Sequence, residues 1–162
     1  MTNRCGLIVL LALLSAPGTV WGQQDIQATL QKLVGTWVQD FSKTRPAPSP
    51  VPRSRTHQWE LAGKDKMRHV SETINANGEK VTTETQTDDY SGKEYPDGDP
   101  GQVSTFRVID ANTIQQIRSR NGQIVRFLER VISPDGKTLT IRQIAVDAQG
   151  KGSQAIQVYY KK

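Results

Sequence analysis

The chain has 162 residues, with 21 Lys or Arg, 16 Asp or Glu and a formal net charge of +5. This length suits a single domain with a substantial buried core. The basic residues are interspersed with acidic ones, so the charge does not indicate a nucleic-acid-binding protein. The only cysteine is Cys5, which excludes a scaffold held by internal disulfides.

The first 22 residues have the organisation of a secretory signal peptide. Arg4 precedes an apolar run, 7–14, and small residues follow up to Gly22. The run is shorter than the roughly 20 residues that cross a bilayer, and no other apolar stretch is long enough for a transmembrane anchor. We therefore predict export to the periplasm or the extracellular space, with cleavage near Gly22. The mature domain would span residues 23–162 and lack Cys5.

One short helix is expected at the start of this domain, over residues 25–34. Ile26, Leu30 and Leu33 fall on one face of that helix, and Asp25 is placed to cap its start. Gly35 ends the helix. Residues 36–41 are then extended, and the proline-rich segment 45–53 forms a stiff connector across the outside of the domain.

The rest of the chain alternates strand-like runs with turn residues, which is typical of an all-β domain. We predict strands over 56–61, 66–74, 81–88, 103–109, 113–120, 123–132, 137–146 and 153–160, with a short extra strand at 93–95. Successive hairpins give a meander, and closing it removes the exposed edges. The prediction is a single up-and-down antiparallel β-barrel of about 8–10 strands.

Turn lengths predict which side chains share the inner face. We assign two-residue turns at 121–122 and 150–151 and three-residue turns at 110–112 and 134–136, and the resulting registers agree on one apolar face. Its members are Phe106, Val108, Ile114, Val125, Phe127, Val131, Leu139, Ile141, Ala145, Ile156, Val158 and Tyr160. The opposite face carries basic residues that we interpret as solvent-exposed, namely Arg107, Arg126, Arg130 and Arg142.

Polar residues also fall on the predicted inner face, where charged groups are rare unless paired. Arg118 is either a guanidinium that recognises an anion at the mouth of a cavity or a rim residue that reaches water. Glu129 lies towards the opposite end, where we expect it to pair with a C-terminal lysine. The candidate ligand contacts in the lumen are Arg118, Gln116, Gln143, Tyr160, Phe106 and Phe127.

No motif of nucleophilic, metal-dependent or phosphate-transfer catalysis occurs in the sequence. His57 and His69 lie on consecutive predicted strands, and one register sets them opposite each other. A zinc site needs three or four ligands, and nothing obvious completes this pair. The acidic residues at 88–89 and at 97 and 99 read as solvated turn residues. We therefore expect no cofactor, no metal and no enzymatic activity.

Residues 35–37, Gly-Thr-Trp after a turn of helix, resemble the opening of lipocalins and fatty-acid-binding proteins, the calycin barrels. Residues 90–96 and 135–138 are similar to motifs of small secreted bacterial lipocalin-like proteins whose role is not established. The resemblance implies a calycin barrel closed at one end by Trp37, with Lys161 or Lys162 over its ring.

The sequence also departs from those families. The proline-rich segment 45–53 stands where fatty-acid-binding proteins have a helical lid. Residues 158–160 keep the tyrosine of their closing strand without the arginine that grips a ligand carboxylate. Residues 87–90 are only similar to a lipocalin motif, which comes later in lipocalin chains. The families' ligand sites therefore do not transfer intact.

Three function classes follow. The leading hypothesis is an exported lipocalin-like binding protein that holds a small lipophilic or amphipathic ligand in its barrel. The alternative is a barrel filled by side chains that acts through protein–protein contacts. An enzyme would need an acid–base pair inside, and Glu129 is the only acidic residue on the predicted inner face.

Overall fold

The computed structural model describes residues 23–84, 87–147 and 149–162, so the predicted signal peptide and its cleavage site lie outside the described residues. The described residues form one helix and eleven strands, namely α1 (Gln23–Leu33), β1 (Gly35–Arg45), β2 (Ser54–Leu61), β3 (Lys66–Ile74), β4 (Lys80–Glu84), β5 (Asp88–Asp89), β6 (Glu94–Pro96), β7 (Gln102–Val108), β8 (Thr113–Arg120), β9 (Gln123–Ile132), β10 (Thr138–Val146) and β11 (Gly152–Lys161). Within these ranges, no helix has the length and apolar character needed to cross a membrane.

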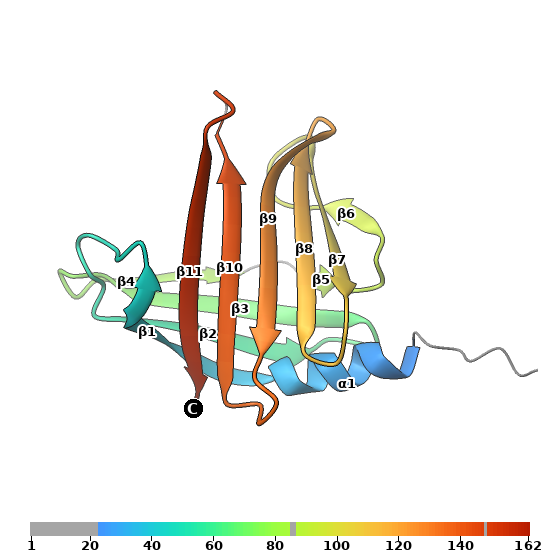
Figure 1. Ribbon diagram of the computed structural model, residues 1–162, viewed down its shortest axis with the longest axis horizontal. Coiled ribbons are helices and arrows are strands. Elements are labelled where there is room, and N and C mark those ends of the chain that lie inside the picture. Colours follow the sequence, from blue (N-terminus) through green and yellow to red (C-terminus); the bar gives the residue numbers. More distant parts are fainter. Residues whose placement is uncertain (1–22, 85–86, 148) are drawn as a thin grey trace, which may run out of the picture.

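The strands form one antiparallel meander in the order β4-β3-β2-β1-β11-β10-β9-β8-β7-β6, and β5 pairs with β3. β1 pairs with both β2 and β11, which joins the two halves of the sheet. Figure 1 shows β1–β3 crossing behind β7–β11, so the halves face each other with the core between them. The all-β up-and-down fold is confirmed, but the described strands β4 and β6 do not pair, so the sheet is not closed.

The helix α1 lies along one end of the barrel, beside the β7–β8 turn (Figure 1). Leu30 and Leu33 are fully buried. Lys32 Nζ donates a hydrogen bond to the Ala111 carbonyl at 2.8 Å, which fixes the helix against that turn. The helix begins two residues earlier than predicted, so Asp25 is its third residue and does not precede it.

The end of the barrel beside the helix is closed by Trp37, which is fully buried. Its Nε1 donates to the Leu33 carbonyl at 2.8 Å. Lys161 Nζ lies 5.2 Å from the centre of the indole ring and donates to the Lys32 carbonyl at 2.9 Å. The cation over the tryptophan is therefore Lys161, and Lys162 contributes only its backbone N–H, which donates to the Thr36 carbonyl at 2.9 Å.

Gly35 is needed at this closed end for two reasons. Its φ is +123°, and an added Cβ would lie 3.0 Å from Lys161 Cε. We expect Gly35→Ala to lower the free energy of unfolding, measured in urea, by about 1–3 kcal/mol, because it combines backbone strain with displacement of the lysine. The control Gly152→Ala has open space around the added Cβ and no positive φ. Equal stability of the two variants would contradict this account.

The β7–β8 hairpin has the register predicted from its turn. Val108 lies opposite Ile114. The next turn also pairs Arg120 with Gln123, as the Asn-Gly signal predicted. Two-residue Asn-Gly turns favour the twist of adjoining strands, so local chemistry was sufficient at these two points.

A bulge then changes the face of β9. Arg118 pairs with Arg126 and Ser119 pairs with Ile124, which leaves Val125 as the extra residue. A single inserted residue reverses the inward and outward positions of the rest of a strand. The predicted inner face of β9 is therefore wrong, and its true inner residues are Arg126, Leu128, Arg130 and Ile132.

The last two turns are longer than predicted. Ile132, not Val131, lies opposite Leu139, so the turn has one residue more than predicted. This extra residue compensates for the reversal of the faces of β9, and the inner residues of β10 are the predicted ones. Ala145 pairs with Ser153, not with Ile156 as predicted. The Asp147 carboxylate accepts hydrogen bonds from the backbone N–H groups of Gln149 and Lys151, which makes the turn longer. β11 is therefore reversed. The residues that move to the outer face are Phe127, Glu129, Val131, Ile156, Val158 and Tyr160.

Candidate functional site

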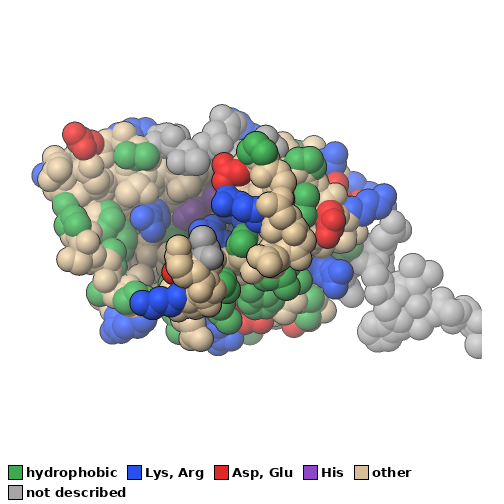
Figure 2. Space-filling view, turned by 90° about the horizontal axis from the view of Figure 1, so that it is seen from above, with side chains coloured by type: hydrophobic (Ala, Val, Ile, Leu, Met, Phe, Trp, Pro, Cys, Tyr) green, Lys and Arg blue, Asp and Glu red, His purple; other side chains and the backbone are tan. Residues whose placement is uncertain are grey.

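A cavity of about 300 Å³ lies between the two halves of the sheet. Figure 2, seen from above, shows a hollow in which histidine and basic side chains are visible. Its charged lining comes from both halves and from the β5–β7 region, and comprises four arginines and two carboxylates, namely Arg55, Arg118, Arg126, Arg130, Asp88 and Asp97. The cavity is therefore more positive than negative.

The structure places four of the six lumen candidates on this cavity, namely Phe106, Gln116, Arg118 and Gln143. The other two, Tyr160 and Phe127, do not face the cavity, so the prediction was wrong for them. Tyr160 is 38% exposed on the outer face and its ring lies 5.0 Å from Lys43 Nζ. Phe127 lies on the outer face between Ile117 and Ile144 of the neighbouring strands.

Glu129 is also not where the sequence placed it. It lies on the outer face and accepts a hydrogen bond from Arg142 Nη1 at 3.0 Å. The bulge at Val125 explains the change, because it exchanges the positions of Glu129 and Arg130. The closed end therefore has Trp37 but not Glu129.

Arg130 is the most deeply buried charge on the cavity, with 6% of its surface exposed. Its Nη2 donates to Gln116 Oε1 at 3.1 Å, and its guanidinium carbon lies 5.3 Å from the centre of the Phe106 ring. Its Nε and Nη1 are buried and have no hydrogen-bond partner among the described residues. Because a buried guanidinium normally satisfies its donors, these two N–H groups are suited to an oxyanion.

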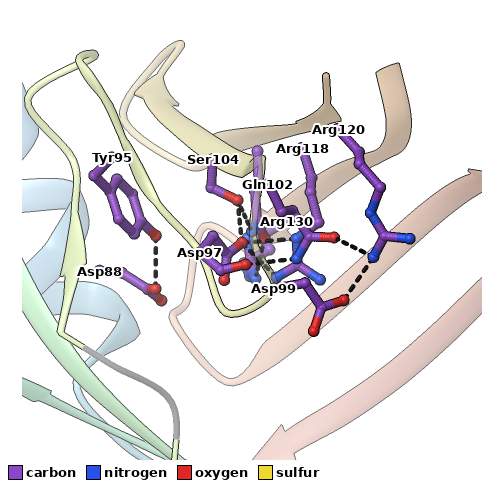
Figure 3. Close-up of polar contacts among 10 residues, drawn as sticks. Asp88, Tyr95, Asp97, Asp99, Gln102, Ser104, Arg118, Arg120 and Arg130 are labelled. Carbon is purple, nitrogen blue, oxygen red and sulfur yellow. Dashed lines mark hydrogen bonds and ion pairs between the residues drawn. The ribbon is translucent and has the colours of Figure 1, made fainter. Parts of the chain in front are cut away.

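A hydrogen-bonded chain connects this group to the mouth of the cavity. The Gln116 amide donates to Ser104 Oγ at 3.2 Å, and Ser104 donates in turn to Asp97. Asp97 also accepts from Arg118 Nε at 2.7 Å and Nη2 at 2.6 Å. Figure 3 shows the Asp97 carboxylate between the Ser104 and Arg118 side chains. The chain fixes the Gln116 carbonyl towards Arg130, and it gives Arg118 a partner that sequence reasoning did not find.

Arg126 lies opposite Arg118 on the inner face and is half-buried. It makes no hydrogen bond or ion pair within the part of the chain that the structure describes. Burial, and next the like charge of Arg118, lower the pKa of Arg126, but an arginine stays charged in proteins. This cation is therefore also suited to an anion.

A second hollow of about 680 Å³ adjoins the first at this end of the barrel, beside the β8–β9 and β10–β11 turns. Arg118 and Arg126 line both hollows. Arg120 also lines the outer one and pairs with Asp99 at 2.6 Å (Figure 3). The arginine-lined end is therefore the mouth of the cavity.

The two histidines meet on the wall opposite Arg130, but not directly across the strands. His57 lies opposite Ser71, and His69 lies opposite Trp59. The diagonal arrangement still brings His57 Nδ1 within 2.5 Å of His69 Nε2. Among the described residues, no group of three His, Cys, Asp or Glu side chains is placed to hold a metal ion.

Hydrogen bonding assigns the tautomers of the two imidazoles. The Tyr159 hydroxyl donates to Gln157 Oε1 at 2.9 Å and lies 3.1 Å from His57 Nε2. Its oxygen therefore accepts from His57 Nε2–H, so His57 Nδ1 accepts from His69 Nε2–H. Burial lowers the pKa of His57 to about 2 and that of His69 to about 3, and the positive charge of Arg130 contributes to both shifts. Both rings are neutral at pH 7.

Arg126 and Arg130 are the candidate site residues that sequence reasoning missed. It placed them on the solvent face because the bulge was not expected. One signal was present in the sequence: Leu128 and Ile132 share a face of the strand with the two arginines and make that face partly apolar. Each face of β9 is about half apolar, so the alternation of apolar residues did not show which face is buried.

The alignments with solved structures of the same fold cover almost the whole length of those structures. Wild-type fluorescent protein UnaG aligns with a TM-score of 0.54 at 15% identity, over 82% of this chain and 99% of that one. Zebrafish ileal bile acid-binding protein complexed with cholic acid aligns with a TM-score of 0.52 at 16% identity, over 81% and 99%. No family model and no curated protein matches the sequence. The fold is that of the calycin barrels of the fatty-acid-binding-protein type.

Proposed function

We propose that this protein binds a small amphipathic anion in its interior cavity, with the acidic group of the ligand at Arg130. The observation that carries the proposal is a guanidinium 6% exposed whose Nε and Nη1 meet no acceptor among the described residues. Burying an unpaired charge costs several kcal/mol, and an oxyanion at either of these donors offsets part of that cost. Binding, not catalysis, is the proposed role.

Apolar side chains beside Arg130 suit the apolar part of such a ligand. Phe106, Leu128 and Ile141 line the cavity beside Arg130. A volume of about 300 Å³ is at the lower end of small-molecule pockets, so the ligand is small. The structure of zebrafish ileal bile acid-binding protein complexed with cholic acid is a precedent for an acid bound by a protein of this fold.

Calorimetric titration with dodecanoate and with dodecanol tests the proposal. We expect dodecanoate to bind saturably at one site, and dodecanol, which lacks the charge, to bind at least about tenfold more weakly. Equal affinities would show that Arg130 does not bind the headgroup. Binding of neither compound would contradict the proposal and favour the alternative described next.

The second candidate function is association with another protein through the outer face of β8–β10. Ile117, Phe127 and Ile144 form a row across these three strands, and Ile144 is 43% exposed. Ile156 on β11 is equally exposed. Apolar rows of this kind mark interaction surfaces in soluble proteins.

We also propose that the protein is exported, on the basis of the charge, apolar run and small-residue end of residues 1–22. Determining the amino terminus of the protein purified from the envelope or medium of its host tests this. We expect the mature chain to begin near Gln23. A chain that keeps Met1 and remains in the cytosol would contradict export, but not ligand binding.

A further inference from the structure

Two arginines on one strand face the same cavity at different depths. Arg126 and Arg130 both point inwards from β9 and are four residues apart, or roughly 13 Å at the usual rise of a strand. Arg130 lies deep, beside Phe106. Arg126 lies at the mouth, where it lines both hollows. The cavity therefore has a cation at each end.

Neither carboxylate of the cavity forms an ion pair with Arg126 or Arg130 among the described residues. Asp97 is bound to Arg118 at 2.6 Å. Asp88 accepts from the Tyr95 hydroxyl at 2.8 Å, as Figure 3 shows. The four arginines of the lining exceed its two carboxylates by two, which complements a ligand with two negative charges.

The wall between the two arginines combines an apolar side chain with two amides. Leu128 lies between them on the same face and is 7% exposed. Gln116 and Gln143 lie opposite Leu128 on the two neighbouring strands, and both line the cavity. Such a wall suits an uncharged spacer, because it holds no charge between Arg126 and Arg130.

From this arrangement we propose that the ligand is an elongated dianion, with an oxyanion at each end of an uncharged spacer. Arg130 binds the inner oxyanion and Arg126 binds the outer one at the mouth. This inference rests on the proposed function, because it assigns the second end of the same ligand. It selects α,ω-dicarboxylates over monocarboxylates of equal length.

Titration with dodecanoate and dodecanedioate tests this inference, with a chain-length series from hexanedioate to hexadecanedioate. We expect the wild-type protein to prefer dodecanedioate to dodecanoate by at least about tenfold, because the second carboxylate gains charge-assisted hydrogen bonds. Affinity should peak at one chain length. Arg126→Gln should remove the preference, so that its affinities for dodecanedioate and dodecanoate agree within about twofold. Arg126→Lys should retain part of the preference, and Arg107→Gln, on the exposed outer face, should change neither affinity.

Equal affinities for the two probes in the wild-type protein would overturn the inference while dodecanoate binding upholds the proposed function. A preference that survives in Arg126→Gln would overturn it in the same way. Failure of both probes to bind would overturn the inference and the proposed function together. Circular dichroism and urea unfolding of each variant establish that it is folded before it is titrated.

Discussion

Replacing Arg130 with methionine is expected to stabilise the ligand-free protein and to weaken dodecanoate binding by at least about tenfold. The variant removes a buried cation two of whose nitrogens have no partner among the described residues. A methionine side chain fills much of the same space without charge, and such replacements commonly stabilise a protein by about 1–4 kcal/mol. The same change removes the donor that binds the headgroup, and a hydrogen bond from a charged group contributes about 1.5–3 kcal/mol.

Opposite changes in stability and affinity distinguish a binding residue from a structural one. Urea unfolding and calorimetric titration measure the two quantities on the same preparation. Arg142→Met is the matched control, because its exposed ion pair with Glu129 lies on the outer face and contributes at most about 1 kcal/mol. If Arg130→Met destabilised the protein and left dodecanoate affinity unchanged, Arg130 would be a structural residue and the proposed headgroup site would be wrong.

Acid should destabilise the protein through His57 and His69. Their folded-state pKa values, about 2 and about 3, are depressed below the ordinary histidine value of 6.5. At pH values between the folded-state pKa and 6.5, the unfolded chain therefore binds more protons than the folded protein. The contribution of the two neutral imidazoles to the free energy of unfolding is fully present above pH 6.5. It falls as the pH drops towards 3, by up to about 1.4 kcal/mol per pH unit for each histidine.

Urea unfolding at pH 7 and pH 5 tests the histidine effect. The double variant His57→Gln/His69→Gln keeps every other titrating group, so the difference in slope isolates the imidazole pair from the carboxylates. We expect the variant to lose less free energy of unfolding between the two pH values than the wild-type protein loses. An equal loss in both proteins would show that the pair is readily protonated in the folded state.

The sequence predicted the fold but only part of the register. Strong local turn signals such as Asn121-Gly122 were sufficient to place the β7–β8 and β8–β9 turns. The extra residue at Val125 has no comparable local signal, because a bulge is selected by how the strand packs in the whole barrel. Turn length at 147–151 depended on an aspartate side chain that accepts backbone N–H groups, which strand periodicity does not show.

The candidate site was predictable on the strands whose inward-facing residues were assigned correctly. Gln116 and Arg118 on β8 and Gln143 on β10 were assigned to the lumen and line the cavity. Arg126 and Arg130 were assigned to solvent because one bulge reversed their strand. The partner of Arg118 was not predictable either, since Asp97 comes from a loop whose position depends on tertiary packing.

In the function proposed above, Arg130 binds the headgroup of an anion inside the barrel. Nuclear magnetic resonance of the arginine Nε–H groups during titration with dodecanoate tests it most directly. We predict that the Arg130 signal shifts saturably with one-site stoichiometry while the signal of Arg107, on the exposed outer face, stays in place. Saturation of the protein by dodecanoate without a shift at Arg130 would contradict the account.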